Sequence, residues 1–388
     1  MGGVGVRIGS GFSPVVDPRV AAIEAGTDAR AALGGAPADL AFVFFSGEHV
    51  RHADAVLEGV HEALDPGVVA GCGAGGVLGA GRECENGSGV AVWAASLAGG
   101  SARAFHAATV STPDGAAVTG LPDIAGASAV ILLADPYSFP VDRALAALGR
   151  AAPRTPVLGG IASARTPDGE AALLLDDRHI GEGAVGVVLD GVEVLPCVSQ
   201  GAAPIGPELT VTAVDRNVVR ELAGRPALDV LREAIEGLDP HERALVSGGL
   251  LLGTVIDGSG PDYGHGDFLV RGIVGVDPDA GTIAVAASVR AGQVVRLHAR
   301  DRDSADRDLR QGLALRRAAL GGSPAGALLF TCNGRGEALF GDEGHDVRAV
   351  EDELGGAAVA GFFAAGEIGP VGGENFVHGF TATVAVFA

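Results

Sequence analysis

Lysine is absent from this sequence of 388 residues, and all 27 basic residues are arginine. Without lysine the protein cannot form the Schiff base of pyridoxal-phosphate enzymes, and it lacks the phosphate-binding lysine of P-loop kinases. Cysteine is also scarce, because the four residues Cys72, Cys84, Cys197 and Cys332 form no C-x-x-C pair. The sequence therefore predicts no metal site and no disulfide framework.

Positive charge is in deficit as well. Acidic residues number 48 against 27 basic ones, which gives a formal net charge of -21 at pH 7. Such a surface repels nucleic-acid phosphates and anionic membranes, so neither is an expected partner. No apolar run reaches about 18 residues, and the N-terminus has no leader-peptide pattern. These absences predict a cytoplasmic protein.

Apolar residues and glycine are plentiful. Hydrophobic residues make up 47 % of the chain, which is enough for a large core and excludes a disordered chain. Glycine contributes 63 residues without a collagen period. Turns and close approaches between backbone segments are the expected use of so much glycine.

One order of elements recurs three times: a buried strand, a helix, a second strand that runs into a glycine-rich turn, and a closing strand. The first strands are residues 40–45, 129–134 and 327–331, which are unbroken apolar runs of strand length. Each second strand is expected to end at a glycine where the chain turns back, at Gly71, Gly159 and Gly361. The recurrence indicates an internal repeat.

The expected fold is α/β with α+β character, in which mixed β-sheets built from repeated β-α-β-β units are covered by helices. Two similar halves are expected to meet near residue 200, giving domains of residues 1–200 and 201–388. Residues 266–299 read as an antiparallel meander that extends a sheet of the C-terminal half. The longest irregular stretch is the loop at residues 258–267.

Polar residues gather around the third repeat. TCNGRGE, residues 331–337, ends a buried strand, and residues 362–381 are expected beside that strand end. Ligands bind at the carboxyl ends of strands in open α/β sheets, and the Arg335 guanidinium suits a carboxylate. Glu367 would orient the ligand or receive an amine. The expected ligand-binding residues are Cys332, Asn333, Arg335, Glu367, Glu374, Asn375 and His378.

Structural interpretations of the same residues stay open. Arg335 and Glu367 could form an internal pair, Glu374 and Asn375 could cap turns, and His378 could be a satisfied core histidine. GCGAGG at residues 71–76 matches the dinucleotide-binding pattern, but no helix follows it, which favours a closely packed backbone turn. His49 and His52 lie one helical turn apart and are expected to face solvent.

Six stretches together resemble one family. In the N-terminal half they are residues 71–92, 132–145 and 156–164, and in the C-terminal half they are residues 198–228, 328–336 and 359–384. They look like the N-terminal and C-terminal domains of the FIST family, named for F-box and intracellular signal transduction proteins. The resemblance covers nearly the whole chain in order.

What this resemblance implies is a bacterial sensory module that binds a small ligand, such as an amino acid or an organic acid. Family members occur beside chemoreceptors and histidine kinases, so we expect a separate signalling partner of that kind. A subset resembles haem-based nitric-oxide sensors, and under that alternative His378 is the first candidate for an axial ligand.

A third hypothesis is a cysteine-dependent enzyme that uses Cys332. No G-x-S-x-G elbow and no nucleophile–base pair supports it, so a non-enzymatic protein is expected.

Overall fold

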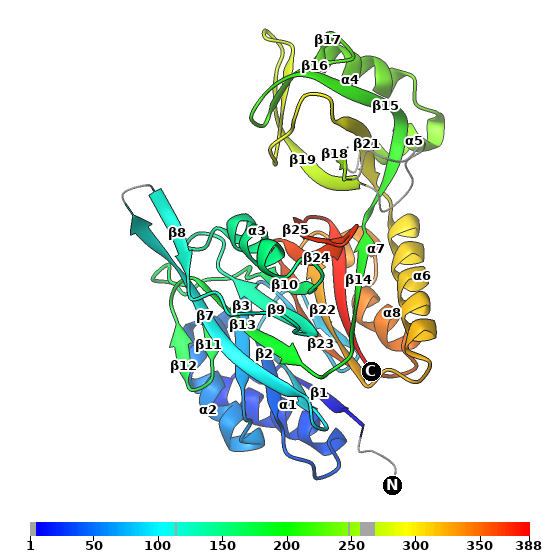
Figure 1. Cartoon of the computed structure of the whole chain (residues 1–388). Helices are drawn as coiled ribbons and strands as arrows, with labels where there is room; N and C mark the ends of the chain where they lie inside the picture. The colour runs from blue at the N-terminus through cyan, green and yellow to red at the C-terminus, as the bar shows by residue number, and fades with distance from the viewer. Residues whose placement is uncertain (1–4, 113–114, 247–248, 257–267) are drawn as a thin grey trace. The chain divides into compact units, whose positions relative to one another are not determined.

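Four sheets with covering helices form the computed structural model, which describes residues 5–112, 115–246, 249–256 and 268–388 (Figure 1). Its mixed sheets confirm the predicted α/β fold with α+β character. The chain divides into two compact units. The repeat unit contains the residues up to Val198, Leu309–Val377 and Ala382–Ala388, and the inserted unit contains Ser199–Asp308 and His378–Thr381.

Three repeats make up the repeat unit, rather than two similar halves. The chain enters the inserted unit near residue 200, but residues 309–377 return to the unit that holds the first two repeats. The first repeat contains β1 (Arg7–Ser13), α1 (Pro18–Ala32), β2 (Leu40–Ser46), a 3-10 helix (Gly47–His52), α2 (Ala53–Leu64), β3 (Val69–Ala74), β4 (Val77–Gly79), β5 (Arg82–Cys84) and β6 (Gly89–Ser96).

The second repeat contains β7 (Ser101–Thr112), β8 (Gly115–Thr119), β9 (Ala129–Ala134), α3 (Val141–Ala151), β10 (Val157–Ile161), β11 (Leu173–Leu175), β12 (Arg178–Ile180) and β13 (Ala184–Asp190). The third contains β14 (Val194–Gln200), α6 (Arg302–Leu320), β22 (Gly326–Cys332), α7 (Glu337–Phe340), α8 (His345–Glu353), β23 (Ala358–Ala364), β24 (Glu367–Val371), β25 (Glu374–His378) and β26 (Thr381–Phe387). The inserted unit therefore lies between the first strand of the third repeat and β22.

Local sequence explains where these elements start and stop. Asp17 caps α1 by accepting hydrogen bonds from the backbone N–H groups of Arg19 and Val20, and Pro18 occupies the first turn. Asp65 adopts a left-handed conformation that ends α2 just before Pro66. The apolar strand β2 is buried along its whole length, as its sequence predicts.

The repeats exchange their hairpins in a cycle. The β4–β5 hairpin of the first repeat extends the sheet of the third, in the order β14-β26-β22-β23-β4-β5. The β11–β12 hairpin of the second repeat extends the sheet of the first, β1-β6-β2-β3-β11-β12. The β24–β25 hairpin of the third extends the sheet of the second, β25-β24-β10-β9-β13-β7-β8. Each sheet is therefore completed by a neighbouring repeat.

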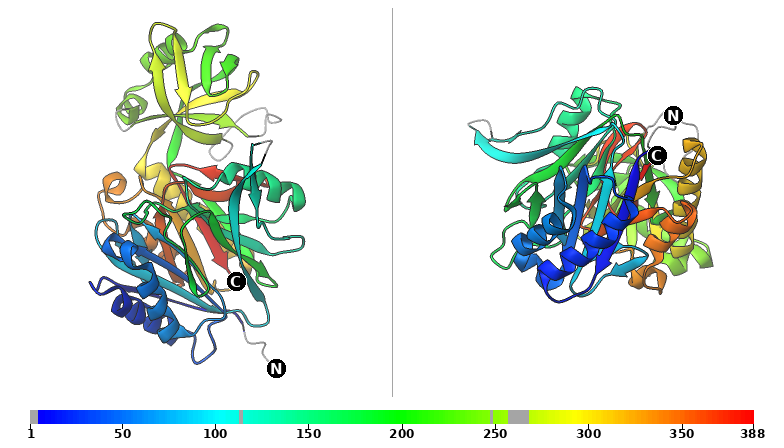
Figure 2. Two further views of the ribbon diagram at one scale, coloured as in Figure 1. Left: turned by 90° about the vertical axis from the view of Figure 1, so that its left-hand side faces the viewer. Right: turned by 90° about the horizontal axis from the view of Figure 1, so that it is seen from below.

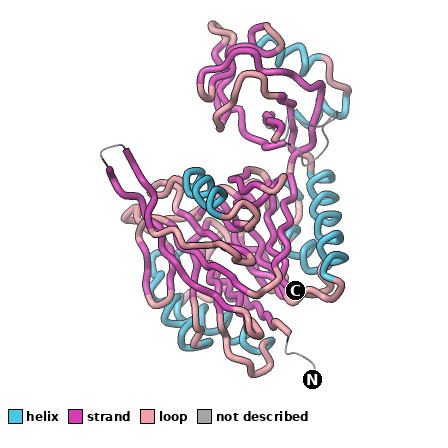
Figure 3. The backbone as a smooth tube through the Cα atoms, viewed as in Figure 1, coloured by secondary structure: helices cyan, strands magenta, loops and turns pink. Residues whose placement is uncertain are grey.

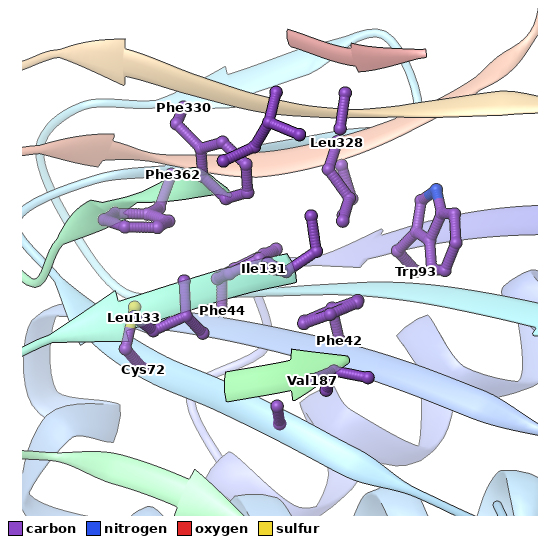
Figure 4. Packing of buried hydrophobic residues seen from close by; sticks show 14 of the residues in the cluster. Phe42, Phe44, Cys72, Trp93, Ile131, Leu133, Val187, Leu328, Phe330 and Phe362 are labelled. Atoms are coloured by element: carbon purple, nitrogen blue, oxygen red, sulfur yellow. The ribbon is translucent and has the colours of Figure 1, made fainter. Parts of the chain in front are cut away.

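One apolar core joins the three sheets of the repeat unit. Phe42, Phe44 and Trp93 come from the first sheet, and they pack in one cluster with residues of the other two sheets (Figure 4). These include Ile131, Leu133 and Val187 from the second sheet and Leu328, Phe330 and Phe362 from the third. Helices cover the faces of these sheets that point away from the shared core, as the two views of Figure 2 and the cyan segments of Figure 3 show.

Three glycines, the register glycines, occupy the same register position in their repeats: Gly71, Gly159 and Gly361. They lie opposite Val43, Leu132 and Leu329 of the parallel neighbouring strand. A Cβ atom there would lie 2.2, 2.0 and 1.7 Å from the carbonyl oxygens of those residues. The glycines therefore permit a close approach of two backbones, but the expectation that they end their strands is wrong, because they lie inside β3, β10 and β23.

The inserted unit is built around one closed sheet. Its strands are β15 (Ala202–Asp215), β16 (Val218–Leu222), β17 (Arg225–Pro226), β18 (Leu250–Val255), β19 (Phe268–Asp277), β20 (Thr282–Val285) and β21 (Val294–Arg300). The order β15-β21-β18-β19-β20-β16 closes through a β15–β16 pairing, and α4 (Ala227–Glu236) and α5 (Pro240–Val246) accompany it.

The expected meander does not extend a sheet of the C-terminal half, because in its described part, from Phe268 on, the strands pair within this closed sheet. The loop at residues 258–267 lies outside the described residues. None of the helices that the structure describes combines the length and apolar character needed to cross a membrane.

Candidate functional site

The carboxyl ends of three parallel strand pairs are the natural place to look for a site. The pairs are β2–β3, β9–β10 and β22–β23, one from each repeat. Ligands of open α/β sheets bind beyond the carboxyl ends of parallel strands. The segments that follow these strands carry the polar residues described next.

Arg335 is committed to an internal ion pair. Its Nε and Nη2 atoms donate hydrogen bonds to the two carboxylate oxygens of Asp346, at 2.7 and 3.0 Å, and the side chain is 1 % exposed. Burial alone would lower the pKa of the Arg335 guanidinium, but the Asp346 carboxylate raises it above its usual range. Glu367 lies near enough to add to this rise, yet the ion-pair partner is Asp346 rather than the expected Glu367.

Asp346 is the centre of a buried polar network. The Thr331 hydroxyl donates to Asp346 at 2.5 Å, and His345 Nδ1 lies 2.9 Å from the same carboxylate. Although burial opposes ionisation, the Arg335 charge and these hydrogen bonds hold the pKa of Asp346 well below its usual range. The network therefore fixes Arg335 as a structural cation.

The other expected residues of this strand end do come together. Cys332 ends β22 and is half-buried, and Asn333 is exposed, with its backbone N–H donating to the Ala364 carbonyl at 3.0 Å. Glu367 begins β24 and is fully buried. Both Cys332 and Glu367 contribute to the electrostatic field at Arg335.

Glu374, Asn375 and His378 lie elsewhere. Asn375 Oδ1 accepts a hydrogen bond from the Val157 N–H at 2.9 Å, and its Nδ2 donates to the Thr155 carbonyl at 3.1 Å. Glu374 is exposed and lines a pocket with Asn375 and α3. His378 is buried and belongs to the inserted unit. The seven expected residues are therefore divided between the Arg335 network, the α3 pocket and the inserted unit, and a common ligand site stays a prediction.

Four residues that sequence reasoning missed place polar groups at the strand ends: Arg165, Tyr137, Asp135 and Ser163. Arg165, 28 % exposed, places Nε 3.0 Å from Asp135 Oδ1 and its Cζ 4.8 Å from the centre of the Tyr137 ring. Tyr137 is 79 % exposed, whereas Asp135 is fully buried. The Ser163 hydroxyl accepts from the Gly75 N–H at 2.8 Å and donates to the Phe363 carbonyl.

The Ser163 hydroxyl of the second repeat is therefore hydrogen-bonded to strand ends of the first and third repeats. Asn333 belongs to the same cluster, since a Cβ atom at Gly75 would lie 3.7 Å from the Ser163 hydroxyl and 4.0 Å from Asn333 Oδ1. Arg165 follows Gly159 at the same spacing as Glu367 follows Gly361. Aligning the second and third repeats at these glycines would therefore have identified Arg165.

The described histidines bear on the expected absence of a metal site and on the haem alternative. His49 is fully buried, contrary to expectation, and burial lowers its pKa, whereas His52 is exposed. The residues that the structure describes contain no group of three potential metal ligands. Three pockets of the repeat unit, of about 340, 460 and 550 Å³, have no histidine in their walls and do not fit a histidine-ligated haem.

Two family models and several known proteins match this chain along most of its length. A family model for the FIST N domain matches residues 39–225, and one for the FIST C domain matches residues 227–370. An uncharacterised protein of Mycobacterium tuberculosis is 44 % identical over 383 residues, covering 98 % of this chain and 100 % of the relative. An uncharacterised protein of Mycobacterium bovis is 43 % identical, covering 98 % and 99 %.

Proposed function

The chain belongs to the FIST family, and from this premise we propose that it is a non-enzymatic sensory protein that binds a small organic anion at the carboxyl ends of its parallel strands. FIST domains are associated with signal transduction and small-ligand sensing. The signal would pass to a separate signalling partner, such as a histidine kinase or a chemoreceptor.

Arg165 is the observation that carries the proposal. Its guanidinium is partly exposed, and the buried Asp135 carboxylate fixes it from one side. Asp135 is itself held by hydrogen bonds from the Ser138 N–H and hydroxyl, at 2.8 and 2.7 Å. A preorganised guanidinium loses little conformational freedom when it binds a carboxylate, and it presents a planar pair of donors.

Arg335 cannot take this role without breaking the buried network. Both oxygens of Asp346 are bonded to it, and removing a partner from a buried ion pair leaves an uncompensated charge. The ligand-binding arginine is therefore assigned to the second repeat instead of the third.

Two of the four cysteines are unsuited to nucleophilic catalysis. Burial raises the pKa of the Cys72 thiol far above its usual range, and burial also raises the pKa of Cys84. A thiol with a raised pKa is a poor nucleophile at neutral pH.

A thermal-shift screen tests the proposal. The melting temperature is measured with acetate, succinate, malate and benzoate against sodium chloride of equal ionic strength. We expect at least one carboxylate to raise it, and Arg165→Gln to abolish the rise. Arg154→Gln removes an exposed arginine of the α3–β10 loop and should keep the rise. Mass spectrometry should recover the stabilising ligand unchanged.

Three outcomes would contradict the proposal. No stabilisation by any of the four acids removes the organic-anion ligand. Stabilisation that persists in Arg165→Gln moves the site elsewhere. Conversion of the ligand during incubation shows an enzyme.

A further inference from the structure

Each repeat brings the C-terminal half of one helix against the turn of an exchanged hairpin. The helix position concerned lies ten residues before the register glycine: His61 in α2, Gly149 in α3 and Glu351 in α8. The threefold repetition makes these three junctions directly comparable.

Side chains span two of the three junctions. His61 Nε2 lies 2.9 Å from the carbonyl oxygen of Asp176, in the turn between β11 and β12. Glu351 accepts a hydrogen bond from the backbone of Gly81, in the turn between β4 and β5. In both cases a polar side chain of the helix closes the space against the hairpin backbone.

The remaining junction, at α3 of the second repeat, is left open because its helix residue is Gly149. A pocket of about 340 Å³ lies between α3 and the start of β25, with walls formed by Leu145, Ala146, Gly149, Arg150, Pro153, Glu374 and Asn375. A Cβ atom on Gly149 would have no heavy atom within 4 Å. Figure 1 shows α3 beside β25, on the outer side of the second sheet.

Opposite charges face this pocket without forming a pair. Arg150 belongs to α3 and Glu374 to β25, and neither makes an ion pair or a side-chain hydrogen bond with any residue that the structure describes. The equivalent of Arg150 in the first repeat is Glu62, which is bonded to Arg19. The charges at the α3 junction are therefore available to a ligand.

Asn375 makes the hairpin wall of the pocket rigid. Its amide is bonded to both Thr155 and Val157, which fixes β25 against the start of β10. One amide hydrogen remains, because an asparagine side chain has two N–H donors and the Thr155 carbonyl uses one. The apolar floor comes from α3, where Leu145 is buried.

We infer that this pocket is a second binding site, which takes a small dipolar molecule whose anionic end meets Arg150 and whose cationic end meets Glu374. The ligand would do at the α3 junction what the side chains of His61 and Glu351 do at the other two. It would bridge the helix and the exchanged hairpin. This inference does not depend on the strand-end site around Arg165.

The test uses three probes of one chain length: 4-aminobutanoate, butanoate and butylammonium, each at matched ionic strength. Melting temperatures are measured for the full chain. We expect 4-aminobutanoate to raise the melting temperature by about 2 °C or more at concentrations well above its Kd, and each singly charged probe to raise it less. Equal effects of the three probes would overturn the dipolar ligand, as would no effect of any of them.

Gly149→His tests the place of the site. It introduces the residue that fills the first junction, at a helical position with open space, so we expect a folded protein that no longer responds to 4-aminobutanoate. Arg150→Gln and Glu374→Gln should each reduce the response to that of a singly charged probe. A full response in Gly149→His would overturn the site.

The two binding sites provide controls for each other. Arg165→Gln should abolish the response to the organic acids and keep the response to 4-aminobutanoate. Arg150→Gln should keep the response to the organic acids and reduce the response to 4-aminobutanoate to that of a singly charged probe. Loss of the 4-aminobutanoate response in Arg165→Gln would show that the probe binds at the strand ends instead.

Discussion

Glu83 accepts a hydrogen bond from the backbone N–H of Val347 at 2.9 Å, across the boundary between the first and third repeats. Its other oxygen accepts from the Gly344 N–H at 3.2 Å. Glu83 thereby caps the N-terminus of α8 from an exchanged hairpin, which is a task usually done by a residue preceding the helix. The helix that carries Asp346 is thus held by a carboxylate from another repeat.

This cap should make the stability depend on pH between about 4.5 and 7. Burial, and next the Asp346 charge, raise the pKa of Glu83 from 4.5 to about 7. Because the folded protein then binds more protons than the unfolded chain, this group's contribution to stability falls as pH rises through that range. The difference amounts to on the order of 3 kcal/mol.

Glu83→Gln measures the effect. The free energy of unfolding of the variant minus that of the wild type should increase from pH 5 to pH 7.5 and stay level above it. A difference that is constant over this range would show that Glu83 titrates normally.

Breaking the Arg335–Asp346 pair should be costly. Arg335→Met leaves the Asp346 carboxylate buried without its cation, and we expect a loss of about 3–5 kcal/mol in urea unfolding. Arg225→Met, which breaks the exposed pair with Glu233, should cost far less, because solvent screens that pair. Similar losses in both variants would mean that Arg335 is not fixed as the structure describes.

The register glycines should be equally intolerant of a side chain. Gly71→Ala and Gly361→Ala each place a Cβ atom against a carbonyl oxygen of the adjacent strand, and each should cost about 3 kcal/mol. Gly159→Ala should cost at least as much, because its φ of +142° is also unfavourable for alanine. Gly149→Ala, in open space within a helix, should be neutral or stabilising.

Chemical denaturation of the four variants measures these costs. A tolerated alanine at any one of the three positions would contradict the equivalence of the repeats.

The strands could be predicted because their signal is local. Residues 40–45, 129–134 and 327–331 are apolar runs that match β2, β9 and β22 to within two residues. The hairpin exchange could not be predicted, because it pairs Leu78 with Gly361 and Leu174 with Gly71, and no local pattern specifies a partner so distant in sequence. The central meander was misplaced for the same reason.

The sequence predicted part of the cluster at the third strand end, and ligand binding there stays a prediction. Asn333 lies near Ser163 and Gly75 of the other two repeats, which the sequence analysis did not anticipate. The partner of Arg335 was missed because Asp346 lies in a charged helix, where an acidic residue usually faces solvent. Arg165 escaped notice because it follows its strand by four residues and belongs to no motif.

The cyclic exchange of hairpins also dictates when the fold can close during synthesis. The hairpin of residues 77–84 leaves the ribosome early, but its acceptor strand β23 begins only at Ala358. The edge of β10 in the second sheet is complete once Ile161 has been made, but its partner β24 begins only at Glu367. Until residues 358–371 have been made, a growing chain exposes strand edges that only those residues cover, which makes premature termination a route to aggregation.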